Sequence, residues 1–360
     1  MTGLLLVGAG HAHLYVLNNA AALQAAGYRV HLLSPRYFYY SGVASATAAG
    51  EMATEVGRID VAALAERSGV TFHEDTLASL ELADRVATTS LGERIDYDVF
   101  SLNIGSVVAP PEMTVEAGVL RVKPLGDLAS LGDRLDAEST GTTITVVGGG
   151  ATGLELAAHL AVRRGVAGVH LLEAGMVLGP ELPPGARRRM LRLLEKRGVV
   201  VRRGCAVAHL GTGHVNCADG MTLAHDAAVL ATGLAAPPVV EELGLGDGRG
   251  VAVRATLQHV DHDEIYAVGD CAHFLPEPLP RIGVHGVKQG PVLVASLLAR
   301  LGAEPLPTYQ PQRRALAILD LGDGTALATW GPLWWLGPAA LRLKRRIDRK
   351  WLERYQVTAS

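Results

Sequence analysis

Two glycine-rich loops hold the residues whose types and spacing could do chemistry. Residues 8–13 have the sequence GAGHAH, and residues 148–153 have the sequence GGGATG. Each loop follows a short run of Leu, Ile and Val and precedes a helical pattern of apolar residues. In a strand–loop–helix unit of this kind, glycines let the backbone approach a pyrophosphate, which the N-terminus of the helix faces. The two loops therefore predict two dinucleotide sites.

The second loop has the complete pattern, with Gly148, Gly150 and Gly153 at the three glycine positions. Glu173 stands 25 positions after Gly148, at the end of the next apolar run. A carboxylate at about this distance binds the ribose 2′-hydroxyl of the dinucleotide. No Lys or Arg immediately follows Glu173, so a 2′-phosphate would be repelled. NADH is therefore favoured over NADPH.

The first loop departs from this pattern at two positions. Gly8 and Gly10 are present, but His13 occupies the position of the third glycine. Ser34 occupies the position of the acidic residue and offers only a hydroxyl. The helix is therefore expected to lie slightly further from the strand than in the second loop.

Each loop belongs to a repeated strand–helix–strand unit. In both copies a glycine, Gly27 or Gly165, ends the helical pattern and a second apolar strand follows. Such units form parallel sheets with right-handed crossovers. The first glycines of the two copies are 140 residues apart, too far for a solenoid repeat. The sequence therefore predicts an α/β protein with two Rossmann-like dinucleotide-binding domains.

Composition narrows the class of protein. The chain has 360 residues, a net charge of −3, 49% hydrophobic and 19% charged residues, which excludes disorder as the main state. No apolar run approaches the ~18–20 residues that span a bilayer, and the N-terminus lacks the features of a secretory signal. Only 3 Cys are present, which fits a reducing cytosol. We expect a cytoplasmic protein with no nucleic-acid partner.

Further motifs carry a family resemblance over nearly the whole chain. They are GAGHAHLYVL, LLSP followed by YYSG, RVKPL, an apolar strand ending in ATG (residues 231–233), YAVGDCA, KQGP, YQPQRR and RIDRKWLERY. With the two repeats, the chain resembles the two-dinucleotide-domain flavoprotein reductases of the pyridine nucleotide–disulfide oxidoreductase superfamily. It looks most like the branch with type II NADH dehydrogenases and sulfide:quinone reductases. Within that branch it is most similar to the flavoprotein module fused to selenide, water dikinase.

The resemblance implies that FAD binds the first loop and NADH the second. It implies a discontinuous FAD domain (1–107 and 252–310), an inserted NADH domain (108–251) and a small C-terminal α+β segment (311–360). The implied NAD contacts are Gly148, Gly150, Gly153, Glu173 and Gly233. The implied FAD contacts are Gly8, Gly10, His11, Ser34, Tyr40, Ser41, Gly105, Gly269, Asp270 and Lys288.

Three residues are the candidates for the chemistry itself. By resemblance Glu155 would orient the nicotinamide; the alternative is a carboxylate stabilised by the helix dipole. By resemblance the helix that starts at about Val284 points at the flavin, where a cation would stabilise the reduced ring. Lys288 and Gln289 on this helix are the candidates for flavin and acceptor contacts. The alternative for Lys288 is a solvated helix cation. For Tyr40 and Ser41, a plain packing role is the alternative to lining the flavin.

Cysteines and histidines give no further site. Cys205, Cys217 and Cys271 are expected to be buried small hydrophobes, and no Cys precedes position 205 to form a flavin-proximal pair. His11 with His13 and His259 with His262 lack a complete ligand set. We therefore expect no metal.

The last residues form a different surface. All four tryptophans lie at or after position 330, and residues 338–360 hold seven Lys or Arg against two acidic residues. A helix is expected from Ala339 to about Tyr355, with Leu343, Ile347, Trp351 and Tyr355 on one face. A basic amphipathic helix of this kind can lie on an anionic membrane, here the inner face of the cell membrane. The alternatives are packing on the FAD domain and a homodimer contact.

The predicted function is an FAD-dependent oxidoreductase that passes a hydride from NADH to flavin and then electrons to a quinone-like acceptor. One alternative is a selenium- or sulfur-linked reductase. Another is a flavin-bound redox sensor or assembly partner with little turnover, because the first loop is altered and the acceptor is unplaced.

Overall fold

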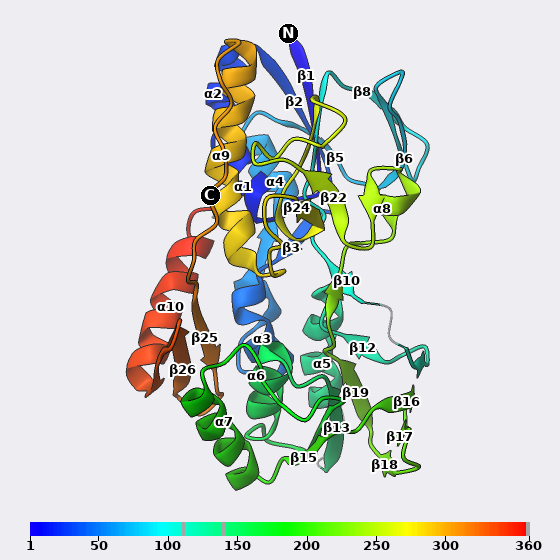
Figure 1. Ribbon diagram of the computed structural model, residues 1–360, viewed down its shortest axis with the longest axis vertical. Helices are drawn as coiled ribbons and strands as arrows, with labels where there is room; N and C mark the ends of the chain where they lie inside the picture. Colours follow the sequence, from blue (N-terminus) through cyan, green and yellow to red (C-terminus); the bar gives the residue numbers. More distant parts are fainter. Residues whose placement is uncertain (110–111, 138–140, 358–360) are drawn as a thin grey trace.

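The structure is a computed structural model that describes residues 1–109, 112–137 and 141–357. Two five-stranded parallel sheets lie at opposite ends of an elongated molecule, with a small C-terminal unit along one side (Figure 1). Both sheets carry helices, as the α/β prediction requires. The predicted fold class is confirmed.

The first sheet has its N-terminal strand at the centre. Its strand order is β23-β9-β1-β2-β5, and all of its pairs are parallel. In that order the strands are Ile265–Ala267, Val99–Leu102, Thr2–Val7, Tyr28–Leu33 and Thr71–His73. Helices α1 (His11–Asn18), α2 (Ala20–Ala26) and α9 (Gly283–Leu301) pack together beside it (Figure 1). Residues far apart in the sequence thus share one core.

The second sheet repeats this topology. Its strand order is β12-β19-β13-β14-β15, again parallel, so β13 takes the place that β1 holds in the first sheet. In that order the strands are Leu120–Arg121, Ala227–Leu230, Thr142–Val147, Val166–Glu173 and Val200–Arg203. Helices α5 (Gly126–Ala137), α6 (Ala151–Leu160) and α7 (Pro184–Lys196) accompany it. The two glycine loops consequently lie at equivalent places in their sheets.

Shorter elements connect and border the sheets. The remaining helices are α3 (Ala44–Ala48), α4 (Val61–Arg67) and α8 (Val239–Glu242), with one-turn helices η1 (Ser41–Val43), η2 (Thr54–Gly57) and η3 (Gly269–Cys271). The remaining strands are β3 (Tyr37–Tyr39), β4 (Arg58–Asp60), β6 (Leu77–Glu81), β7 (Val86–Thr89), β8 (Arg94–Asp96), β10 (Val107–Val108), β11 (Thr114–Val115), β16 (Val207–Leu210), β17 (His214–Cys217), β18 (Thr222–Ala224), β20 (Leu234–Ala235), β21 (Gly246–Asp247), β22 (Gly250–Val253) and β24 (Ala272–Phe274).

The C-terminal unit is an antiparallel sheet with one helix. Strands β25 (Leu316–Asp320), β26 (Ala326–Trp330) and β27 (Leu333–Gly337) pair in order, and α10 (Pro338–Leu352) packs on them. None of the described helices is long and apolar enough to cross a bilayer.

The four apolar residues that the spacing places on one face of the last helix differ in burial. Trp351 and Tyr355 are buried, but Leu343 is 36% and Ile347 43% exposed. Lys344 and Asp348 take the inner positions instead, at 8% and 9% exposure. The two charges pair with each other at 2.8 Å, which lets the helix bury them.

All three cysteines are buried, as expected, but two of them are paired. Cys205 and Cys217 form a disulfide between the turn after β15 and strand β17. Cys271 is a buried free thiol, and burial raises its pKa to about 12. A thiolate nucleophile at Cys271 is therefore disfavoured.

Candidate functional site

The second glycine loop needs its glycines for packing. Gly148 has a φ of +118°, which favours glycine. A Cβ on Gly153 would collide with the carbonyl oxygen of Gly148, so only glycine lets α6 pack this close to β13. Beside the loop, a Cβ on Gly233 would meet nothing within 4 Å, and the buried hydroxyl of Thr232 has no hydrogen-bond partner. Open space and an unsatisfied polar atom fit a dinucleotide here.

Glu173 lies at this loop, as its spacing predicts. Its Oε2 accepts a hydrogen bond from the N–H of Gly149 at 2.7 Å, and its Oε1 accepts one from Gly175 at 2.7 Å. The carboxylate is half-buried at the end of β14. Each oxygen retains a lone pair, so a ribose hydroxyl can still donate to it.

A second carboxylate, which the sequence reasoning missed, occupies the N-terminus of α6. The N–H of Ala151, the first residue of that helix, donates to Oε1 of Glu181. Glu181 itself is exposed and lies in the turn before α7. Its charge satisfies the helix dipole at the place where a pyrophosphate would bind. No spacing rule indicates this residue, because the loop after β14 folds back onto the glycines.

His13 replaces the third glycine of the first loop and is fully buried. Its Nδ1 lies 2.6 Å from the carbonyl oxygen of Gly8, which can only accept, so Nδ1 carries the hydrogen. Its Nε2 then accepts from the hydroxyl of Ser101 at 2.8 Å. Burial lowers the pKa of His13 to about 4, so the ring is neutral at physiological pH. In this loop, hydrogen bonds of the imidazole to Gly8 and Ser101 thus take the place of the close backbone contact that a third glycine would allow.

Asn103 connects the first loop to its neighbours through hydrogen bonds. Sequence reasoning did not identify this residue. Its Oδ1 accepts from the N–H groups of Ala12 and His13 at 3.1 and 3.2 Å, and its Nδ2 donates to Val268 at 2.7 Å. A Cβ on Gly10 would collide with this amide. The sequence did contain a signal for this role. Asn103-Ile104-Gly105 begins with a polar residue, whereas the related motif in the second domain begins with Ala231.

The predicted FAD contacts are only partly available. Gly105 has a φ of +75°, and a Cβ there would meet nothing within 4 Å, which leaves room beside the loop. Asp270 is half-buried and accepts from Ser106 at 2.8 Å. Ser34, in contrast, is 3% exposed, and its hydroxyl hydrogen is already donated to the carbonyl oxygen of Pro35 at 3.0 Å, so it could only accept from a ligand.

The start of α9 lies against this loop. Gln289 is buried, and its Oε1 accepts from the N–H of Gly269 at 2.6 Å. Gln289 therefore fixes the turn that carries Asp270. Lys288 is exposed and does not line the cavities described below.

A cavity of about 310 Å³ lies between the first loop, the start of α9 and the C-terminal unit. His11, Tyr40 and Ser41 line it, with Gly42, Gly283, Val284, Val287, Leu316, Ile318, Lys344, Ile347, Asp348 and Trp351. Tyr40 stacks on Trp351 with ring centroids 4.3 Å apart, and His11 lies 4.9 Å from the same indole. Burial, with the Lys123 charge, lowers the pKa of His11 to about 3. The cavity is therefore largely apolar and aromatic.

Charged residues form one wall of this cavity. Lys344 donates to Asp348 at 2.8 Å and to the carbonyl oxygen of Gly42, and Tyr40 donates to Asp348 at 2.9 Å. The same lysine and aspartate line a second cavity of about 190 Å³, which Glu155 also lines. Glu155 accepts from the hydroxyl of Ser45 at 3.1 Å and from the N–H of Asp320 at 2.7 Å. Burial raises its pKa.

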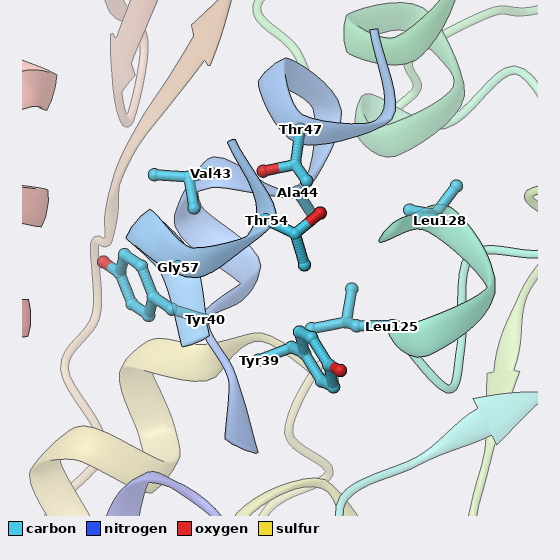
Figure 2. A pocket seen from close by; sticks show the side chains of 9 residues that line it. All are labelled: Tyr39, Tyr40, Val43, Ala44, Thr47, Thr54, Gly57, Leu125 and Leu128. Atoms are coloured by element: carbon cyan, nitrogen blue, oxygen red, sulfur yellow. The ribbon is translucent and has the colours of Figure 1, made fainter. Parts of the chain in front are cut away.

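A third cavity lies beside Tyr39 and Leu125, between η1, α3 and α5 (Figure 2). Its volume is only about 20 Å³. A space of this size holds little more than one water molecule. It is too small for an electron acceptor, so the 310 Å³ cavity is the better candidate.

The fold and the two loops together define a two-dinucleotide-domain oxidoreductase. Residues 2–290 match the Pyridine nucleotide-disulphide oxidoreductase family, and the chain belongs to it. It is therefore a pyridine nucleotide-dependent oxidoreductase. The predicted cofactors, FAD and NADH, are confirmed at the level of the family.

Relatives and solved structures agree with this assignment. An NADH dehydrogenase-like protein of Mycobacterium tuberculosis is 27% identical over 367 residues, covering 92% of this chain and 88% of the relative. The structure of NDH2 from Plasmodium falciparum in complex with NADH matches with a TM-score of 0.83 and 13% identity, over 98% of this chain and 96% of that one. The sulfide:quinone oxidoreductase of Aquifex aeolicus matches with a TM-score of 0.82 and 17% identity, over 100% of this chain and 93% of that one. The two structures show the fold alone.

Proposed function

We propose that this protein passes a hydride from NADH to FAD and then two electrons to a quinone-like acceptor. The observation that supports the acceptor proposal is the 310 Å³ cavity, whose lining is mostly apolar and aromatic, with Lys344 and Asp348 along one wall. A flat, uncharged ring fits such a cavity, and one cation could hydrogen-bond its carbonyl oxygen. The NADH dehydrogenase-like relative from Mycobacterium tuberculosis supports the NADH half of this proposal.

The two glycine loops divide the cofactors between them in this proposal. Gly8, Gly10 and His11 face the FAD pyrophosphate, and Asp270 binds its ribityl chain. Gly148, Gly150 and Glu173 hold NADH. FAD, when bound, supplies the two-electron chemistry, while the protein positions and tunes it.

The reduction of the flavin itself gives the first test. Purified protein loaded with FAD and titrated with NADH without oxygen is expected to lose its flavin absorbance at one equivalent. A chain that cannot be loaded with FAD, or a flavin that NADH does not reduce, would contradict the proposal.

Replacing Glu155 by glutamine tests its proposed role in orienting the nicotinamide. We expect kcat for NADH oxidation to fall about tenfold or more, because the charge is lost while the amide oxygen still accepts from Ser45 and Asp320. Burial raises the pKa of Glu155 in the folded state, so the folded protein favours the protonated side chain. The contribution of Glu155 to the free energy of unfolding is therefore present at low pH and is lost as the pH rises. The glutamine variant should therefore melt no lower than wild type at pH 8. A lower melting temperature with unchanged kcat would contradict the role.

Replacing Glu181 by glutamine tests whether this carboxylate competes with the pyrophosphate. Removing its charge from the N-terminus of α6 is expected to lower KM for NADH about threefold, with kcat unchanged. Glu195→Gln, on the exposed face of α7, is the matched control and should change neither constant. An unchanged or raised KM in Glu181→Gln would show that the nucleotide does not meet this side chain.

The alternative of selenium or sulfur chemistry finds little support in the thiols. Two of the three cysteines form a disulfide in the second domain, and burial keeps Cys271 protonated. Flavin reduction by sulfide or selenide and not by NADH would favour a selenium- or sulfur-linked reductase. Slow reduction by NADH and NADPH alike would favour a redox sensor.

We propose that residues 339–355 meet an anionic membrane. The exposed side chains of Leu343 and Ile347 lie among Arg342, Arg345, Arg346 and Arg349, and β27 adds exposed Leu333, Trp334 and Trp335. Sedimentation with vesicles that contain anionic lipid, but not with neutral vesicles, is the expected result. A concentration-dependent dimer without vesicle binding would assign this face to a second copy of the chain.

A further inference from the structure

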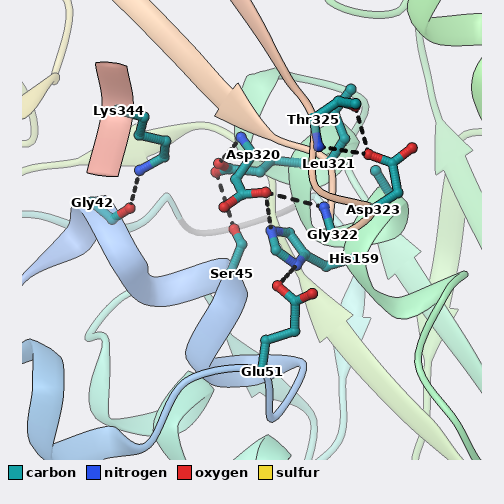
Figure 3. A network of polar contacts seen from close by, with 12 residues as sticks. Gly42, Ser45, Glu51, His159, Asp320, Leu321, Gly322, Asp323, Thr325 and Lys344 are labelled. Atoms are coloured by element: carbon teal, nitrogen blue, oxygen red, sulfur yellow. Dashed lines mark hydrogen bonds and ion pairs between the residues drawn. The ribbon is translucent and has the colours of Figure 1, made fainter. Parts of the chain in front are cut away.

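A buried histidine joins the three parts of the molecule. His159, on α6, is 1% exposed. Its Nδ1 lies 3.2 Å from Oε2 of Glu51, in the segment after α3, and its Nε2 lies 3.6 Å from Oδ1 of Asp320, at the end of β25 (Figure 3). The three residues thus come from the first domain segment, the second domain and the C-terminal sheet.

The hydrogen bonding of this group is incomplete. Neither ring nitrogen of His159 makes a hydrogen bond of acceptable geometry, although both are buried. Asp320 Oδ1 accepts from the N–H of Gly322 at 3.1 Å, which leaves its other lone pairs free. A neutral imidazole has one N–H and so could serve only one of the two carboxylates. Both carboxylates thus approach a buried imidazole whose nitrogens make no hydrogen bond, and a bound cation would satisfy all three groups.

One ligand atom from each of the three residues lies within 4.8 Å of the others. Imidazole and carboxylate are the ligand types that first-row divalent ions share, and a set of three leaves positions for water. The 190 Å³ cavity that Glu51 and Asp320 line provides room for those waters. The ammonium of Lys344 in the same cavity makes its direct contacts with Asp348 and Gly42, so it is not a hydrogen-bonding partner of the group.

We propose that Glu51, His159 and Asp320 bind one divalent transition-metal ion that holds the C-terminal sheet against the two domains. The ion is structural and takes no part in electron transfer. Spacing could not indicate this site, because its residues are separated by 108 and 161 positions. This proposal does not depend on which electron acceptor the protein uses.

The test uses FAD-loaded, full-length protein stripped with EDTA and titrated with Mn²⁺ or Zn²⁺. We expect one ion per chain by calorimetry, loss of the free Mn²⁺ signal in electron paramagnetic resonance, and a rise in melting temperature. Glu51→Gln, a partly exposed ligand whose loss should not prevent folding, is expected to weaken binding about tenfold or more, as is Asp320→Asn. Glu55→Gln, an exposed carboxylate in the next turn of the same segment, is the control and should bind like wild type.

Two results would overturn the site. The first is a metal affinity that Glu51→Gln and Asp320→Asn leave unchanged, which would place any bound ion at surface histidines. The second is a melting temperature that responds to pH but not to metal, which would assign the group to an imidazolium ion between two carboxylates. His159→Gln, if folded, should abolish the metal-dependent rise.

Discussion

Replacing Glu173 by arginine is expected to raise KM for NADH about 30-fold, because it removes one charge-assisted hydrogen bond of about 2 kcal/mol. The carboxylate sits at the end of β14 and already accepts from Gly149 and Gly175. Arginine removes the acceptor and places a cation where a 2′-phosphate could bind. The ratio of kcat/KM for NADPH to that for NADH should therefore increase.

Matched variants separate the ribose contact from a loss of loop structure. Glu173→Gln keeps one oxygen acceptor and should raise KM less than Glu173→Arg. Glu195→Arg makes the same charge change on an exposed face of α7 and should leave KM unchanged. An unchanged KM in Glu173→Arg would remove the proposed ribose contact.

Replacing Lys344 by methionine is expected to lower stability by about 3–5 kcal/mol, the usual effect of removing one partner of a buried ion pair. Asp348 would keep only the hydroxyl of Tyr40, and the carbonyl oxygen of Gly42 would lose its donor. Burial alone would lower the pKa of Lys344, but Glu155 and Asp348 raise it above the usual value. The ammonium is therefore charged at neutral pH, and thermal denaturation of the variant measures its loss.

Two further variants give this prediction its controls. Lys350→Met removes an exposed charge from the same helix and should change stability by no more than about 0.5 kcal/mol. The double variant Lys344→Met with Asp348→Asn should regain part of the loss, because the unpaired charge of Asp348 is removed as well. Equal melting temperatures for Lys344→Met and Lys350→Met would show that the pair does not dock α10.

The fold was predictable because both sheets follow a local pattern. The apolar runs that become β1 and β13, each followed by glycines and a helix, define the two units without knowledge of the rest of the chain. Glu173 was predictable for the same reason, since the length of one strand–helix–strand unit fixes its position.

The residues that sequence reasoning missed act between units. Asn103 binds α1 from another strand, and Glu181 reaches α6 from the following loop. Hydrophobic periodicity grouped Leu343 and Ile347 with Trp351 on one face. Lys344 and Asp348 take the inner positions beside them, because a paired lysine and aspartate can be buried when they neutralise each other. Such tertiary pairings leave no periodic signal.

The most direct test of the central claim measures which acceptor reoxidises the reduced flavin. Protein reduced with one equivalent of NADH without oxygen is mixed in a stopped-flow instrument with a short-chain quinone, a ferredoxin or a sulfur compound. Recovery of the flavin absorbance by the quinone, at a rate at least equal to steady-state turnover, is the predicted result. A flavin that stays reduced with quinone and is reoxidised by another acceptor would contradict the account.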